Sequence, residues 1–463
     1  MAAAAAAAAA TAAATTAATT VVPVGGGYDD APLRLAPPGA LAGVLHAALA
    51  TARDMWVPAV SGRDAATGAA LIGRVSARGL TPERFMREYV ARNIPVIITD
   101  ALEAWPATKL WSPEFLREHY GDTPVTINTT PDGWGDALLP PHAAAPLLPP
   151  VEEAPSATAA ASSAPASSVM ITPADRDRPW FVMPHEVVTT LGDVLTSLQG
   201  AARDGDPRGT VAPHATDATA GAIPYLSFQN DNLRRQIPAL ARHLGPLSFS
   251  PWGPPSVDAL NLWIGDGRST SSLHKDPYDN LYAVVRGTKL FYLYPPPDVL
   301  WLYERSYPVA RYVRHHAAGC PAAAAVAAAC TPHCTWSLAP QAAGGGDGGS
   351  GSGNMARTRW LTVNPQAAPA AHGDDLPLAS RATPYCAAVA AGEVLFLPAL
   401  WHHQVAQVGL TIAVNWWHDM DYTGPGWAYY NVCRTLSRFT TRGAHDDDAG
   451  DDAALAAATL VDT

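Results

Sequence analysis

Apolar residues in the first half of the chain recur at the spacing of short amphipathic helices, separated by brief apolar runs. Three segments have the helical spacing: LTPERFMREYVARN (80–93), WSPEFLREHYGD (111–122) and LGDVLTSLQ (191–199). Thr81 and Pro82 supply a capping residue and a proline at the first helical position. Strands are predicted between the helices at IPVIITDAL (94–102) and PVTINTT (124–130), and a turn is predicted at PDGWG (131–135).

From residue 259 onward the apolar positions take the character of β-strands. Five runs show it: ALNLWIG (259–265), NLYAVV (280–285), KLFYLYPP (289–296), EVLFLP (393–398) and LTIAVNWW (410–417). Arg286 and Gly287 separate two of these runs, which predicts a hairpin with its turn at this pair. Helices followed by consecutive strands predict a mainly β fold with α elements, an antiparallel barrel or sandwich with a helical N-terminal cover.

Several long stretches are biased towards alanine, proline, serine, glycine or aspartate, which lowers the expected size of the folded part. Such segments bury too little apolar surface to offset the entropy lost on ordering. We therefore expect one domain over residues 80–440, after a poorly ordered segment at 1–79. Low-complexity insertions are expected at about 142–169 and 317–383, and an acidic, disordered tail at 441–463.

The formal net charge of −11 makes a basic nucleic-acid-binding surface implausible and suits a basic protein partner. No run approaches the about 18 uninterrupted apolar residues of a membrane span, so no membrane partner is expected. Five cysteines in 463 residues do not suggest a disulfide framework. These features predict an intracellular, reducing location, with the cytoplasm first and the nucleus second.

Candidate metal chemistry begins in TSSLHKDPYDNLY (270–282), where a histidine and an aspartate stand two residues apart. Residues i and i+2 of a strand point to the same face. His274 and Asp276 can therefore offer an imidazole and a carboxylate to one point. A second histidine would complete the two-histidine, one-carboxylate donor set that suits Fe(II) and leaves open coordination positions.

LPALWHHQVAQ (397–407) supplies two histidines for the third position. Adjacent strand residues face opposite ways, so only one of His402 and His403 can join the same site. Lys289 stands in a nearby apolar strand, where a buried cation is costly unless an anion pairs with it. A dicarboxylic acid cosubstrate would supply that anion.

Taken together, these motifs resemble the JmjC family of Fe(II)- and 2-oxoglutarate-dependent oxygenases, and within it the lysyl hydroxylases. The resemblance covers most of residues 80–436 and is carried by these segments: IPVIITDALEAWPA (94–107), TPDGWGDA (130–137), LGPL (244–247), LNLWIGDGRSTSSLHKD (260–276), DNLYAVVRGTKLFYLYPP (279–296), AGEVLFLPALWHHQV (391–405) and IAVNWWHDMDY (412–422). It implies a double-stranded β-helix, the jelly-roll or cupin-like barrel of this family.

The resemblance also implies roles for single residues. His274, Asp276 and His403 would bind the metal, since the family pattern places its last ligand five residues after the proline, here Pro398. His402 stands where the family usually has an aromatic residue, and Ser271 where it often has threonine. The residues implied to hold 2-oxoglutarate or to line its pocket are Tyr225, Ser271, Asn280, Lys289 and Asn415.

The implied reaction consumes O2 and 2-oxoglutarate and hydroxylates C-3 of a lysine in a translation-linked GTPase. Asp132 and Asp136 are the candidate carboxylates for that lysine, although an aspartate in a PDG turn often serves the turn itself. The family also implies a homodimer formed through C-terminal elements.

Three alternatives stay open. The same chemistry would serve a histone lysine demethylase, although no chromatin-reader or zinc module accompanies the barrel. A non-catalytic barrel that binds a partner is a second alternative, although decay would be expected to remove a ligand or Lys289. Endopeptidase activity is proposed for members near this subtype, but the chain has neither an HExxH motif nor a nucleophile elbow. Separately, Cys320, Cys330, His333 and Cys334, near His315 and His316, are a candidate structural zinc site, although their C-x9-C-x3-C spacing is irregular and the intervening run is alanine.

Overall fold

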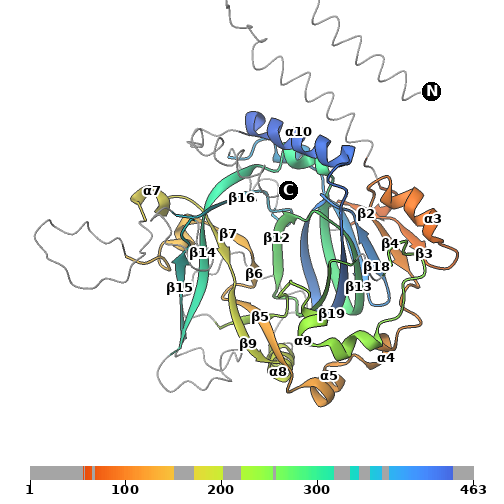
Figure 1. Cartoon of the computed structure of the whole chain (residues 1–463). Coiled ribbons are helices and arrows are strands. Elements are labelled where there is room, and N and C mark those ends of the chain that lie inside the picture. Colours follow the sequence, from red (N-terminus) through yellow and green to blue (C-terminus); the bar gives the residue numbers. More distant parts are fainter. Residues whose placement is uncertain are drawn as a thin grey trace, which may run out of the picture. The chain divides into compact units, whose positions relative to one another are not determined.

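The computed structural model describes residues 56, 58–64, 68–150, 171–201, 221–253, 257–316, 334–343, 355–367 and 375–441. All of these except Trp56 belong to one compact unit, Pro58–Thr463. The unit is mainly β, and its strands form a barrel-like sheet with two smaller sheets beside it (Figure 1). This architecture confirms the predicted fold class. Within the described residues, no helix combines the length and hydropathy needed to cross a membrane.

Two long antiparallel strands form the centre of the barrel. Strand β13 (Tyr278–Tyr294) pairs with β19 (His402–Asp419) along almost its whole length, from the pair Tyr278–Asp419 to the pair Tyr294–His402. The pairing register shifts on both sides of Arg286, so both strands bend at this point.

The two halves of these strands have different outer neighbours. The first half of β13 pairs on its other edge with β18 (Val394–Leu397), and its second half pairs with β17 (Tyr385–Ala390). On the other edge of β19, β12 (Thr270–Lys275) pairs with its first half and β11 (Ala259–Gly265) with its second half. One continuous sheet therefore turns into two facing layers, as a double-stranded β-helix requires. The sheet is extended at its edges by β1 (Val60–Arg63), β2 (Ala70–Ile72), β3 (Arg74–Ser76), β4 (Val96–Thr99) and β6 (Trp134–Gly135).

The predicted hairpin at Arg286–Gly287 is wrong. The chain does not reverse there: both apolar runs belong to β13, and their common partner is β19. Gly287 has φ of +78°, and a Cβ atom at this position would lie 2.5 Å from the carbonyl oxygen of Leu410. Glycine is therefore required by the bend and by the close approach of the two backbones, not by a turn.

Two smaller sheets flank the barrel. One contains β10 (Ile223–Tyr225), β5 (Pro124–Thr130) and β9 (His185–Thr190). The other contains β7 (Ala137–Leu139), β8 (Trp180–Met183), β14 (Glu304–His316), β15 (Cys334–Pro340) and β16 (Arg357–Leu361). Strands from both sheets bring side chains to the barrel cavity described below.

Helices from the N-terminal half of the chain lie around the outside of the barrel, and the last helix, α10, lies over one end (Figure 1). The α-helices are α3 (Pro82–Phe85), α4 (Pro106–Leu110), α5 (Pro113–Tyr120), α6 (Pro141–Ala144), α7 (Pro173–Arg176), α8 (Leu191–Ala201), α9 (Asn232–Gln236) and α10 (Pro425–Thr440). A π-helix, Met86–Val90, continues α3, and 3-10 helices occur at Pro238–His243, Pro296–Leu300 and Ala379–Arg381.

The predicted helix starts at Thr81 and Ser112 are confirmed by their caps. The Thr81 side chain accepts a hydrogen bond from the Arg84 amide at 3.2 Å, and Ser112 accepts one from the Phe115 amide at 3.1 Å. The apolar faces of these helices join one core with the barrel strands, in which Phe85 packs edge-on against Phe396. The helical cover therefore shares its hydrophobic core with the barrel.

Domain boundaries differ from those expected in three places. The fold begins before residue 80, because β2 pairs with β17 and β3 pairs with β4. Within the expected insertion at 142–169, Leu147 and Leu148 are buried in a core beneath β14 and β15. Within 317–383, β15 and β16 add strands to β14. Biased composition on either side concealed these short elements. Residues 151–170, 317–333, 344–354, 368–374 and 442–463 lie outside the described residues.

Replacing Gly287 with alanine tests whether the bend of β13 requires glycine. The new Cβ would meet the backbone of β19, so we expect a loss of about 2–4 kcal/mol in the free energy of unfolding. Urea denaturation of the two proteins measures it.

Gly409→Ala is the matched control, since Gly409 has φ of +61° and a Cβ added there would have no other atom within 4 Å. It should cost only about 1 kcal/mol, the penalty of the left-handed backbone alone. Equal losses in the two variants would show that the close contact with β19 is unimportant.

Candidate metal centre and its cavity

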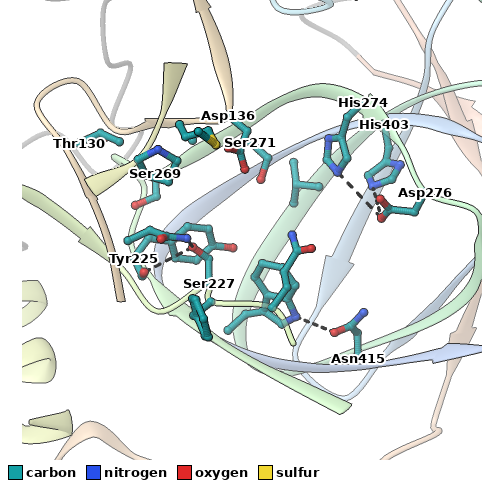
Figure 2. A pocket seen from close by; sticks show the side chains of 18 of the residues that line it. Thr130, Asp136, Tyr225, Ser227, Ser269, Ser271, His274, Asp276, His403 and Asn415 are labelled. Carbon is teal, nitrogen blue, oxygen red and sulfur yellow. Dashed lines mark hydrogen bonds and ion pairs between the residues drawn. The ribbon is translucent and has the colours of Figure 1, made fainter. Parts of the chain in front are cut away.

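A cavity of about 380 Å³ opens inside the barrel. Its lining comes from both barrel layers through β11, β12, β13 and β19, and from the flanking sheets through β5, β9, β10, β14 and β16. Of the predicted site residues, these line it: Asp136, Tyr225, Ser271, His274, Asp276, Asn280, His403 and Asn415. Figure 2 labels all of them except Asn280 and shows their side chains converging from several strands.

Three side chains of this cavity form a compact donor group. His274 and His403 are opposite each other in the β12–β19 pairing, and Asp276 follows directly after β12. The Asp276 Oδ2 atom lies 4.0 Å from Nε2 of His274 and 3.6 Å from Nε2 of His403. One ligand atom from each residue lies within 4.8 Å of the others, a spacing that can accommodate a metal ion.

Backbone carbonyls orient both imidazoles of this group. Nδ1 of His274 lies 2.8 Å from the carbonyl oxygen of Ser272, and Nδ1 of His403 lies 2.9 Å from that of Trp401. With Nδ1–H donated to these carbonyls, each Nε2 lone pair faces Asp276. Burial, reinforced by the nearby His274, lowers the pKa of His403 to about 4, so this imidazole is neutral at pH 7, as a ligand must be.

His402 points away from the cavity. Its side chain is fully buried on the opposite face of β19, where its Nε2 lies 3.5 Å from the Tyr430 hydroxyl of α10. Burial, with a smaller contribution from Lys275, lowers the pKa of His402 to about 3. Adjacent histidines therefore occupy two environments, and only His403 belongs to the donor group.

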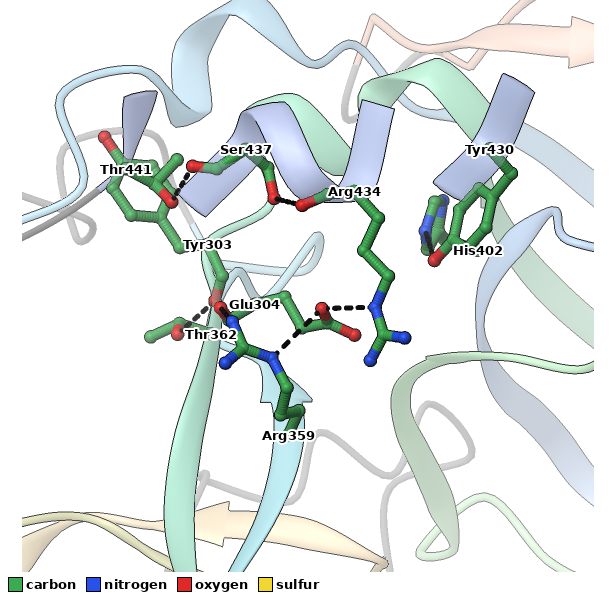
Figure 3. Close-up of polar contacts among 9 residues, drawn as sticks. All are labelled: Tyr303, Glu304, Arg359, Thr362, His402, Tyr430, Arg434, Ser437 and Thr441. Atoms are coloured by element: carbon green, nitrogen blue, oxygen red, sulfur yellow. Dashed lines mark hydrogen bonds and ion pairs between the residues drawn. The ribbon is translucent and has the colours of Figure 1, made fainter. Parts of the chain in front are cut away.

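Behind this face, a buried carboxylate ties α10 to the sheet (Figure 3). Glu304 of β14 accepts a hydrogen bond from Arg434 of α10 at 2.7 Å and lies 3.4 Å from Arg359 of β16. The two arginines lower the pKa of Glu304 against the opposing effect of burial. This network holds α10 against the face of β19 that carries His402.

Lys289 lies in another part of the same barrel and is almost fully buried. Its Nζ donates to the Tyr225 hydroxyl at 2.9 Å and to Oε1 of Gln407. Burial lowers the pKa of Lys289 to about 7, and no acidic group contributes to this shift. Within the described part of the chain, Lys289 has no carboxylate partner. It can therefore provide a cation for an anionic ligand that reaches Tyr225.

Gln407 was not predicted as a site residue, although its spacing from His403 indicates that it faces the inside of the barrel. It stands four residues after His403 on β19 and opposite Lys289 on β13, so strand alternation places it on the inner face. Its Oε1 also accepts a hydrogen bond from Thr411. Gln407 thus fixes the Lys289 ammonium through a neutral acceptor.

Asn280 and Asn415 form a second polar pair in the cavity. Nδ2 of Asn415 donates to Oδ1 of Asn280 at 3.0 Å, while Nε1 of Trp263 donates to Oδ1 of Asn415 at 2.8 Å. These bonds fix the orientation of both amides and leave the Asn280 NH2 group available to donate.

The two candidate substrate carboxylates, Asp132 and Asp136, occupy different environments in the structure. Asp132 is buried, is absent from the cavity lining, and accepts a hydrogen bond from the Trp134 amide at 3.1 Å. It has the turn role that the PDG sequence suggests, so its prediction as a substrate residue is not supported by its position. Asp136, four residues later, does line the cavity.

Trp360 of β16 also reaches the cavity and was not predicted. Its ring lies nearly parallel to that of His274, at 9° and with 6.2 Å between ring centroids. Its Nε1 donates to the Ser272 hydroxyl at 2.9 Å. Its strand lies within the stretch 317–383 that was expected to be a low-complexity insertion, and for this reason Trp360 was not predicted as a site residue.

The proposed zinc cluster is only partly described. Cys334 is buried, and its Sγ lies 3.5 Å from Nδ1 of His316, whereas His315 contacts the Ser337 hydroxyl at 2.7 Å. Cys320, Cys330 and His333 lie outside the described residues.

Comparisons with known proteins match this architecture. The family pattern of the cupin-like domain covers residues 82–424. The chain is 30% identical over 362 residues to the human bifunctional peptidase and (3S)-lysyl hydroxylase JMJD7, across 77% of this chain and 87% of that protein. JmjC domain-containing protein E of Dictyostelium discoideum is 29% identical over 370 residues, 78% of this chain and 87% of that protein. This chain belongs to the cupin-like JmjC family.

A plant JmjC relative carries a different name. Lysine-specific demethylase JMJ32 of Arabidopsis thaliana is 30% identical over 368 residues, across 77% of this chain and 84% of that protein. Relatives of similar identity are thus named for hydroxylation and for demethylation. Overall identity does not distinguish between the two reactions.

JmjC enzymes depend on Fe(II) and 2-oxoglutarate, and the residues of this chain fit both. Two imidazoles with free Nε2 atoms and one carboxylate are the donor set typical of non-haem Fe(II) oxygenases. Lys289 is buried, is bonded to a tyrosine hydroxyl and has no acidic partner among the residues that the structure describes, so it matches the distal carboxylate of a 2-oxo dicarboxylic acid. The JmjC assignment and the local chemistry therefore agree.

Replacing each of the two adjacent histidines with alanine in turn tests the JmjC metal site. His403→Ala should weaken binding of Mn(II), used as an O2-stable substitute for Fe(II), by on the order of a hundredfold, because it removes a direct ligand. His402→Ala should leave the affinity within about threefold, since that side chain faces α10. Calorimetric titration measures both, and thermal melting identifies any unfolding. The reverse order of effects would contradict the assignment of His403 to the centre.

Proposed function

We propose that this protein is an Fe(II)- and 2-oxoglutarate-dependent oxygenase that hydroxylates C-3 of a lysine side chain in a protein. A translation-linked GTPase is the substrate class implied by the resemblance to the lysyl hydroxylases of the family. The name of the human relative, which includes (3S)-lysyl hydroxylase, supports the reaction. The predicted location in the cytoplasm, with the nucleus second, is part of the proposal.

One observation supports the oxygenase reaction most directly. The donor group of His274, Asp276 and His403 shares the barrel with a buried lysine that has no acidic partner among the described residues. A metal-binding barrel with a purely structural role has no need of that cation, and an uncompensated cation is costly to bury. The donor group and the buried lysine together fit a reaction that uses both a metal and a dicarboxylate.

Under this proposal, His274, Asp276 and His403 hold Fe(II), which supplies the activation of O2 coupled to oxidation of the 2-oxo acid. Lys289 and the Tyr225 hydroxyl bind the distal carboxylate of 2-oxoglutarate. Their position is fixed before the ligand arrives, because Gln407 holds the ammonium from the opposite strand.

The remaining polar residues would line the bound cosubstrate. Asn280 can donate from its NH2 group, because its Oδ1 already accepts a hydrogen bond from Asn415. Ser271 lines the same cavity from β12 and offers a hydroxyl. Phe291 and Val405 contribute apolar walls to the same cavity.

Lysine demethylation is the second candidate, and the Arabidopsis relative named as a demethylase favours it. Both reactions use the same metal and cosubstrate, and they differ in the carbon presented to the metal. Hydroxylation of an aliphatic side-chain carbon adds one oxygen to the peptide. Demethylation removes one carbon and two hydrogens for each methyl group.

Mass spectrometry distinguishes the two proposals. The Fe(II)-loaded full-length protein, incubated with 2-oxoglutarate and lysine peptides from translation-linked GTPases, should add one oxygen to a lysine. Methylated histone peptides should keep their methyl groups. Loss of methyl groups without any added oxygen on the GTPase peptides would overturn the hydroxylase proposal, and shortened peptides would reveal peptidase activity instead.

Replacing Lys289 with methionine tests the cosubstrate role. The side chain keeps its length and loses its charge, so the apparent KM for 2-oxoglutarate should rise on the order of a hundredfold. Mn(II) affinity should change little, because Lys289 makes no contact with the donor group. Lys109→Met, which removes an exposed lysine of α4, is the matched control and should not change KM. An unchanged KM in Lys289→Met would exclude the role.

The pH dependence of cosubstrate binding provides an independent check. In the free protein burial holds the pKa of Lys289 at about 7, while a bound dianion favours the protonated ammonium and raises it. Above pH 7, binding must therefore take up a proton. We expect the Kd for 2-oxoglutarate to rise with pH above about 7, by up to about tenfold per pH unit. A Kd that is constant between pH 7 and 9 in the Mn(II)-loaded protein would contradict this.

A further inference from the structure

We propose that the Asp136 carboxylate is a recognition site for an unmethylated ammonium group, the one carried by the substrate lysine. This inference rests on the proposed function and makes it more specific. It names the chemical group that the cavity selects and the residue that selects it. It also separates Asp136 from Asp132, which serves the turn.

The backbone at Asp136 is fixed beside the donor group. β6 pairs in parallel with β12, with Gly135 opposite Ser271. The next residue of β12, Ser272, donates its hydroxyl hydrogen bond to the carbonyl of Asp136, and its own carbonyl orients His274. One serine thus connects Asp136 to a metal-ligand candidate. Trp360 in turn donates to this serine, so three strands contribute to the arrangement.

The conformation of Asp136 is itself unusual. Its φ is +47°, in the left-handed region that non-glycine residues seldom occupy. This backbone lies in the short connection between β6 and β7, and the side chain lines the cavity. Aspartate is among the residues that tolerate this region best, so the position combines a tolerated backbone with a carboxylate at the site.

The Asp136 carboxylate makes no hydrogen bond or ion pair with other residues that the structure describes. Burial raises the pKa of Asp136, as does the charge of Glu186, while His274 and Arg311 act in the opposite direction. Arg311 is already engaged, because its guanidinium donates to Glu186 at 2.7 Å and to the carbonyl of Pro184 at 3.0 Å. The carboxylate of Asp136 is therefore available to a cation that enters from outside.

The cation of Lys289 does not neutralise Asp136 either. Burial alone accounts for the lowered pKa of Lys289, so no acidic group acts on it. The ammonium of Lys289 is bonded to Tyr225 and Gln407, and the carboxylate of Asp136 lines the cavity without a bonded partner among the described residues, so the two charges act separately. A dicarboxylate is drawn to Lys289, and a cationic side chain is drawn to Asp136.

An unmethylated ammonium fits this carboxylate better than a methylated one. It has three N–H donors, each of which can form a charge-assisted hydrogen bond. Every methyl group removes one donor, and a trimethylammonium group has none. Preference for the unmethylated group would favour hydroxylation of lysine over removal of its methyl groups.

The test uses the Mn(II)-loaded full-length protein and Nα-acetyl-lysine methylamide as the probe. Paramagnetic Mn(II) in the donor group accelerates proton relaxation of a side chain bound nearby, and a titration gives its Kd. We expect enhanced relaxation of the ε-methylene protons of this probe. The Nε-acetyl and Nε-trimethyl probes should bind at least about tenfold more weakly, because they lack the charge or the donors.

Two substitutions at Asp136 and one matched control complete the experiment. Asp136→Asn should weaken binding of the lysine probe by at least about tenfold. Asp136→Gly, in which the glycine also suits a positive φ, should do the same. Glu186→Gln removes one negative charge from the same cavity, but from a carboxylate already paired with Arg311, and should change Kd by less than about threefold. Mn(II) affinity and melting temperature verify that the variants are folded.

Three results would overturn the inference: no enhancement with the wild-type protein, equal binding of the acetylated or the trimethylated probe, or equal losses in Asp136→Asn and Glu186→Gln. The last would indicate a general effect of negative charge. Failure of the proposed function is separate. If peptides gain no oxygen while the lysine probe still depends on Asp136, the ammonium site stands and the hydroxylase proposal falls.

Discussion

The antiparallel pairing of β19 with both β12 and β13 determines where the polar side chains of the cavity lie. On one side, this register sets His403 opposite His274, and on the other it sets Gln407 opposite Lys289. Side chains alternate along a strand, so a slip of one residue would bring His402 into the cavity and turn His403 towards α10. The metal donors and the cosubstrate cation therefore depend on one set of backbone hydrogen bonds, which Gly287 permits by allowing the two strands to bend together.

Much of this arrangement could be predicted because strand periodicity is local. The two-residue spacing of His274 and Asp276 places both on one face whatever the rest of the sheet does. The choice between His402 and His403 required more, since either could face inward until the register is known. The family resemblance supplied that choice, and the structure places His403 in the cavity. Extending the same alternation by four residues would also have identified Gln407.

What could not be predicted depends on contacts between distant segments. A two-residue Arg-Gly break between apolar runs has the same appearance at a hairpin turn and at a bend in one long strand, and only the partner strand distinguishes them. Trp360 lies in a short strand surrounded by low-complexity sequence. Its contact with the site is a hydrogen bond to Ser272, 88 residues away in the chain. Asp132 and Asp136 look equivalent in sequence, yet one faces the turn and the other faces the cavity.

The donor group cannot by itself determine which reaction the protein performs, because relatives named for hydroxylation and for demethylation have comparable identity to this chain. Selectivity must then come from residues that position the substrate carbon. The separate positions of Lys289 and Asp136 in the fold would provide such a constraint. Under the two proposals, a dianion at Lys289 and a cation at Asp136 would be held at different positions around the same donors. The length of side chain between an ammonium at Asp136 and the metal would then decide which carbon is presented, so the carboxylate that binds the nitrogen would also set the site of oxidation.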